Sequence, residues 1–94
     1  MKTLTLFYLE DCPYCRNARR ALKELGEENP SYEKIAIDWI EESRQPQIAE
    51  QYDYYYVPAV FFGKDKLYEA RPSESYLACK DKLREVLDSA LAAE

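Results

Sequence analysis

Short apolar stretches recur along the chain, and four of them predict β-strands. Over residues 3–9, Leu4, Leu6 and Tyr8 share one side, while the opposite side is also largely apolar. A strand with two apolar sides is typical of the centre of a sheet that is covered on both faces. The other strands are expected at residues 32–38, 59–62 and 66–70, and Gly63-Lys64-Asp65 between the last two predicts a hairpin.

Three further stretches predict helices, and the first and third place apolar residues three or four positions apart, which is the spacing of one helix face. The first comprises residues 13–25, and Gly26 can end this helix. The second runs from Ser43, which can cap it, to about Gln51, with Pro46 tolerated in its first turn. The third comprises residues 73–91, and its apolar stripe consists of Tyr76, Cys79, Leu83, Val86, Leu87 and Ala90.

The predicted elements follow the order βαβ-αββα. The first helix is long enough to cross over between two parallel strands, and the final hairpin adds antiparallel strands. We therefore expect an α/β fold in which a four-stranded mixed sheet has helices on both faces. Residues 1–94 are expected to form a single domain, since the chain is too short for two.

Composition and charge narrow the class of protein. Of the 94 residues, 47% are apolar, which is enough for one modest core. The net charge of -5 argues against nucleic acid and anionic membranes as partners, because both require an excess of Lys and Arg. No run approaches the roughly 18 apolar residues of a membrane span, and the N-terminal apolar stretch is too short for a signal peptide. We expect a cytoplasmic monomer.

The stretch Cys12-Pro13-Tyr14-Cys15 falls between the first predicted strand and the first helix. Pro13 suits the first helical position, which makes Cys12 the N-cap, where free N–H groups and the helix dipole stabilise a thiolate. Cys15 lies nearly one turn further on the inward stripe, within disulfide reach of Cys12. One exposed, activated sulfur beside one shielded sulfur is the arrangement that thiol–disulfide exchange needs.

Other uses of the cysteines remain open at this point. A zinc site needs about four ligands, but the chain has no histidine and only Cys79 besides the pair, so carboxylates would have to complete it. A metal or cluster shared between two chains is a second alternative, and purely structural cysteines are a third. We expect no metal within the chain, and we expect Cys79 to be buried in the core.

A second motif, Val57-Pro58, directly precedes the third predicted strand. Together with Cys12 and Cys15, it resembles the thioredoxin superfamily, and the Cys-Pro-Tyr-Cys sequence resembles its glutaredoxin branch. The resemblance spans nearly the whole chain and implies the thioredoxin fold. It also implies that Pro58 is cis, beside Cys12, and that the backbone of Val57 is free to pair with an extended substrate. Glutathione is implied as a co-substrate, with no bound cofactor.

The chain departs from the glutaredoxin pattern where that family recognises glutathione. Leu9 stands where a basic residue is usual, and Tyr56 stands where threonine usually precedes Val-Pro. A Gly-Gly turn is missing before the last helix, although Arg71 could meet a carboxylate and Ser73 could cap that helix. Glu10 and Asp11 add negative charge beside a site for an anionic tripeptide. These departures from the family pattern predict weakened glutathione recognition.

The sequence therefore predicts a dithiol oxidoreductase that reduces protein or glutathione mixed disulfides, with Cys12 attacking and Cys15 resolving. Electrons would come from glutathione or a thioredoxin-reductase-type enzyme. Tyr14 is expected to be exposed, and Tyr54, Tyr55 and Tyr56 either pack in the loop or form an aromatic wall. A binding module that holds a protein partner or a shared cluster is the alternative, but it would need neither cysteine. The expected substrate-binding residues are Pro13, Tyr14, Tyr56, Val57, Pro58, Arg71 and Ser73.

Overall fold

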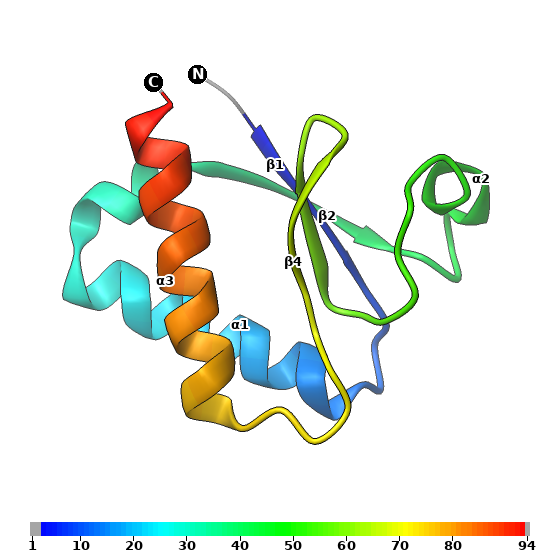
Figure 1. Cartoon of the computed structure of the whole chain (residues 1–94), viewed down its shortest axis with the longest axis horizontal. Helices are drawn as coiled ribbons and strands as arrows, with labels where there is room; N and C mark the ends of the chain where they lie inside the picture. The colour runs from blue at the N-terminus through cyan, green and yellow to red at the C-terminus, as the bar shows by residue number, and fades with distance from the viewer. Residues whose placement is uncertain (1–2, 94) are drawn as a thin grey trace.

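The computed structural model describes residues 3–93, so the first two residues and the last residue of the expected domain lie outside it. A sheet with strand order β2-β1-β3-β4 forms the centre (Figure 1). β1 pairs parallel with β2 and antiparallel with β3, and β3 pairs antiparallel with β4, which confirms the expected mixed sheet. The elements are β1 (Thr3–Tyr8), α1 (Pro13–Glu28), the 3-10 helix η1 (Pro30–Lys34), β2 (Ala36–Glu41), α2 (Pro46–Ala49), β3 (Ala59–Phe62), β4 (Asp65–Glu69) and α3 (Tyr76–Ala92).

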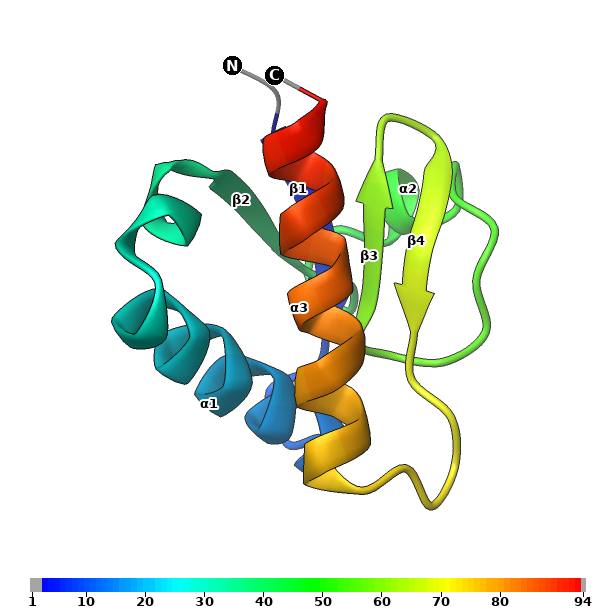
Figure 2. The ribbon, with the colours of Figure 1, turned by 60° about the vertical axis from the view of Figure 1, so that its left-hand side comes forward.

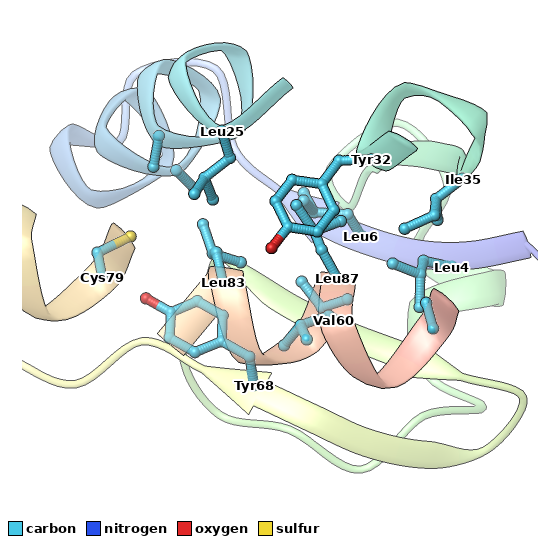
Figure 3. Close-up of a cluster of buried hydrophobic side chains, with 14 of the residues drawn as sticks. Leu4, Leu6, Leu25, Tyr32, Ile35, Val60, Tyr68, Cys79, Leu83 and Leu87 are labelled. Carbon is cyan, nitrogen blue, oxygen red and sulfur yellow. The ribbon is translucent and has the colours of Figure 1, made fainter. Parts of the chain in front are cut away.

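Helices cover both faces of the sheet, as the two-sided pattern of β1 predicts. Figure 2 shows α3 in front of the strands and α2 behind them. On the face of α1 and α3, Leu4 and Leu6 of β1 pack with Leu25 of α1 and Leu83 of α3 (Figure 3). On the opposite face, a second cluster of buried side chains consists of Phe7, Ile40, Ala59 and Phe61. The partly buried side chains that pack against it are Ile48, Ala49, Tyr52, Tyr54 and Val57.

The expected end of the first helix is wrong. α1 continues through Gly26, which is buried in the helix, and ends at Glu28. The stop comes from Asn29, whose extended backbone leaves the helix while its N–H still donates to the Leu25 carbonyl. The Asn29 side chain then accepts a hydrogen bond from the Ser31 N–H and begins η1. For that reason, β2 begins at Ala36 instead of residue 32.

Two expected helix caps are also wrong. The N–H and hydroxyl of Ser43 both donate to the Glu41 carboxylate, at 2.6 Å each, so this hydroxyl does not cap α2. α2 instead begins at Pro46 and has only four residues. The cap of α3 is Ser75, whose hydroxyl accepts from the Ala78 N–H at 3.1 Å. Ser73 lies outside the helix with a positive φ of 68°.

Charged side chains join α1 to α3 along their exposed edge. Lys80 of α3 lies 3.2 Å from the carboxylate of Glu24, and Arg84 lies 3.2 Å from that of Glu28. The Tyr76 hydroxyl donates to Glu24, and together with Lys80 it lowers the pKa of that carboxyl to about 2. The hydrogen bonds from Lys80 and Arg84 likewise lower the pKa of the Glu28 carboxyl.

These depressed pKa values predict acid sensitivity. A carboxyl with a lowered folded-state pKa stabilises the fold above its unfolded-state pKa, and that stability is lost as the pH falls through the folded value. For Glu24 the window runs from 4.5 down to about 2. The urea midpoint is expected to fall across this window, and to fall less in Lys80→Met than in the exposed control Lys23→Met. Equal falls in both variants would contradict this assignment.

Candidate active site

The start of α1 positions the first cysteine. Cys12 has an extended backbone and precedes Pro13, the first residue of the helix, which confirms its expected place at the N-cap. Its sulfur accepts a hydrogen bond from the Cys15 N–H at 3.3 Å, and its carbonyl accepts from the Arg16 N–H at 3.0 Å. The sulfur therefore occupies the capping position that an oxygen fills in most helices, next to the positive end of the helix dipole.

The two sulfurs differ in their access to solvent. Cys12 is half-buried, whereas only 4% of Cys15 is exposed. Burial, and then the hydrogen bond with Cys12, raises the pKa of the Cys15 thiol to about 12, and the nearby charge of Glu42 adds to this. All three cysteines are free thiols, and the third, Cys79, is buried in the core as expected.

The Val57-Pro58 loop lies directly beside Cys12. Its peptide bond is cis, and the Cys12 thiol donates to the Val57 carbonyl at 3.8 Å, which confirms the expected geometry. Pro58 is buried, and its carbonyl accepts from the Ala70 N–H at 3.0 Å. Within residues 3–93, no acceptor is found for the Val57 N–H, so this donor is available to a ligand.

Tyr14 differs from its expected state, because it is half-buried and not exposed. Its ring packs against the core cluster on the face of α1 and α3. Its hydroxyl accepts a hydrogen bond from the Ser73 N–H at 2.7 Å. The structure thus joins the Cys12-to-Cys15 turn to the loop before α3. Arg71, on the same loop, is exposed, and no ion pair forms on it among the described residues.

The three consecutive tyrosines divide between packing and surface. Tyr54 stacks on Phe7, with ring centroids 4.9 Å apart, and donates to the Glu42 carboxylate at 3.1 Å. Tyr55 and Tyr56 are exposed, by 87% and 51% of their surface. The packing alternative therefore applies to Tyr54, while the other two remain available as an apolar rim.

Three acidic residues make contacts near the site that the sequence did not predict. Glu10 forms an exposed ion pair with Arg44 at 3.5 Å, which reduces its repulsion of an anion. Glu42 contacts Tyr54, and Glu69 of β4 accepts from the backbone of the loop before Val57. No local motif marks these side chains, because their partners lie far from them in sequence or depend on strand pairing.

A groove of about 830 Å³ opens beside the same loop, between the edge strand β4 and α3. Its lining begins at Tyr56 and Arg71 and extends to Lys82 and Val86 on α3. Across the part of the chain that the structure describes, no three His, Cys, Asp or Glu side chains stand together as a ligand set for a metal ion.

Comparison with known families shows which family the chain belongs to. The sequence model of the family described as Glutaredoxin matches residues 4–67. The chain belongs to the glutaredoxin family. Membership agrees with the cysteine pair at the start of α1 and implies thiol–disulfide oxidoreductase activity, with disulfide substrates and glutathione as the usual reactants of the family.

Solved structures confirm the fold of this glutaredoxin-family chain. A mutant thioredoxin from Halobacterium salinarum is 20% identical, with 93% of this chain and 72% of that chain covered and a TM-score of 0.61. A designed protein is 25% identical, with 95% and 75% covered and a TM-score of 0.59. The chain therefore has the expected thioredoxin-like fold. A search of curated proteins finds no match, and no helix within residues 3–93 is long and apolar enough to span a membrane.

Proposed function

We propose that this protein reduces disulfide bonds in other proteins through a dithiol cycle of Cys12 and Cys15. The observation that carries the proposal is the pairing of an accessible sulfur at a helix start with a buried thiol one turn away. The Cys12 thiolate attacks one sulfur of the substrate disulfide, and the other sulfur leaves as a thiolate that takes up a proton. A mixed disulfide between Cys12 and the substrate results.

Cys15 completes the cycle. Its thiol loses a proton and attacks the Cys12 sulfur, which releases the second substrate sulfur as a thiolate and leaves a disulfide between the two cysteines. Two electrons have then passed to the substrate. Glutathione or a thioredoxin-reductase-type enzyme returns them, which requires a reducing compartment, and we place the protein in the cytoplasm for this reason.

The surroundings of Cys12 suit an extended polypeptide. The free Val57 N–H offers a backbone hydrogen bond to a substrate strand, and Pro58 fixes the chain that follows it. Pro13 and Tyr56 are exposed and present apolar surface to a substrate, while the Tyr14 hydroxyl accepts a hydrogen bond from the Ser73 N–H. Arg71, which forms no ion pair among the described residues, can offer its guanidinium to a carboxylate of the substrate.

The direct test is the reduction of a disulfide-bonded protein such as insulin with dithiothreitol as the electron source. We expect the wild-type protein at micromolar concentration to accelerate this reaction well above the rate with dithiothreitol alone. Equal rates with and without the protein would refute the proposed function.

Glutathione is expected to be a poor reductant for this chain. The family's usual basic residue is replaced by Leu9, and Asp11 repels the carboxylates of the tripeptide. One charge-assisted hydrogen bond is worth about 1.5–3 kcal/mol, which corresponds to about tenfold or more in rate. Leu9→Lys combined with Asp11→Thr should therefore raise the rate at which glutathione reduces a mixed disulfide on Cys12 by about tenfold.

The variant Glu27→Lys is a matched control, since it changes the net charge by the same amount at the far end of α1. It should leave the rate with glutathione unchanged. If the wild-type protein already turns over glutathione mixed disulfides efficiently, and the double substitution adds nothing, Arg71 or another group supplies the site and the expectation fails.

A further inference from the structure

Glu69, an acidic residue of the neighbouring strand, binds the backbone of the loop before Val57. One carboxylate oxygen of Glu69 accepts the N–H of Tyr55 at 2.5 Å and the N–H of Tyr56 at 2.7 Å. The other oxygen accepts from the Lys66 ammonium at 2.9 Å. Both oxygens of a side chain that is only 19% exposed are therefore occupied, and two of the three bonds go to consecutive backbone groups of one loop.

Strand pairing explains how Glu69 reaches the loop. Glu69 is the last residue of β4 and lies opposite Ala59, the first residue of β3. Figure 2 shows the segment before β3 passing the end of β4. The next residue, Ala70, donates its N–H to the Pro58 carbonyl at 3.0 Å. The end of β4 thus holds the chain before Val57 with a carboxylate and the chain after it with a backbone N–H.

Val57 lies between these two attachments, and its carbonyl accepts from the Cys12 thiol at 3.8 Å. The hydrogen bonds from Lys66, Tyr56 and Tyr55 outweigh the effect of burial and lower the pKa of the Glu69 carboxyl. The side chain is therefore charged at neutral pH, and hydrogen bonds to a charged acceptor are stronger than those between neutral groups.

We infer that Glu69 is a positioning residue that holds residues 55–57 so that the backbone of Val57 can bind a protein substrate beside Cys12. The inference rests on the proposed function, because it concerns the docking of a disulfide-bearing polypeptide. Glu69 does not touch the reacting sulfurs. Glu69 therefore strengthens the binding of an extended polypeptide. It should not affect the reduction of a small disulfide, which forms no backbone hydrogen bonds with Val57.

Removing the carboxylate frees two backbone donors and the loop that carries them. For Glu69→Ala, the KM for a protein disulfide should rise about tenfold, because the backbone of Val57 is then no longer held in its binding position. The kcat should stay within about twofold of the wild-type value. Glu69→Gln keeps an oxygen acceptor at the same distance, so it should restore part of the loss, with a KM about threefold above wild type.

Two readouts separate positioning from a general loss of structure. The rate at which iodoacetamide alkylates Cys12, and the turnover of a small disulfide such as hydroxyethyl disulfide, should change less than twofold in both variants. Glu85→Gln is the matched control, because this exposed residue of α3 lines the same groove and removes the same charge. Its KM should equal that of the wild-type protein.

A wild-type KM in Glu69→Ala would overturn the inference while leaving the proposed function intact. Losses of equal size for the protein disulfide, the small disulfide and Cys12 alkylation would also overturn it, because they would indicate a general structural role. A wild-type protein that fails to reduce protein disulfides at all would instead refute the proposed function, so the two failures can be told apart.

Discussion

Cys12→Ser is expected to abolish protein-disulfide reduction, because a serine hydroxyl cannot take part in thiol–disulfide exchange. Cys15→Ser is expected to stop the cycle one step later. Cys12 still attacks the substrate, but no thiol remains to release it, so a mixed disulfide accumulates. Non-reducing electrophoresis and mass spectrometry of the complex should locate the link at Cys12 and show that it disappears on addition of dithiothreitol.

The third cysteine provides the control for this experiment. Cys79 is 2% exposed on the core face of α3, so Cys79→Ala removes a thiol without touching the site. It should keep the wild-type rate of disulfide reduction and should form no trapped complex. If Cys12→Ser instead captured substrate on Cys15 at the wild-type rate, the roles of the two cysteines would be reversed. That result would conflict with the burial of the Cys15 sulfur.

Sequence patterns predicted the four strands and the three α-helices in their order, but they missed the 3-10 helix η1 and failed where side chains compete for the backbone. β1 was predictable because two largely apolar sides are typical of a central strand that is covered on both faces. The end of α1 was not, because Asn29 leaves the helix in an extended conformation and needs no glycine. Ser43 and Ser73 failed as caps for a related reason. Glu41 binds the hydroxyl of Ser43, and Ser75 lies closer to the first turn of α3.

The candidate site was predictable to the extent that it is encoded locally. Cys12 and Pro13 mark a helix start by their own chemistry, and the place of Pro58 follows from the order of the strands. The half-buried state of Tyr14 depends on a partner 59 positions away in sequence, and the contact from Glu69 to the Tyr56 N–H depends on the exact register of β4. Contacts of this kind cannot be predicted from periodicity and composition.

The second core cluster links the stability of the fold to this site. Phe7 is fully buried at the centre of that cluster, where its ring lies 4.8 Å from that of Tyr52 and 4.9 Å from that of Tyr54. Phe61 approaches it edge-on at 5.8 Å. Tyr54 begins the segment that leads to Val57, so the aromatic packing behind the sheet also anchors the chain that faces Cys12.

Phe7→Ala is therefore expected to lower the free energy of unfolding by about 3–5 kcal/mol, because it removes apolar contacts and leaves a cavity among three rings. Small domains have only about 5–15 kcal/mol in total, so urea or thermal unfolding should show a large fall in midpoint. Phe7→Leu refills most of the space and should cost markedly less. The exposed Tyr55→Ala is the control and should change stability by less than about 0.5 kcal/mol. A loss below about 1 kcal/mol in Phe7→Ala would mean that the cluster is not a tightly packed part of the core.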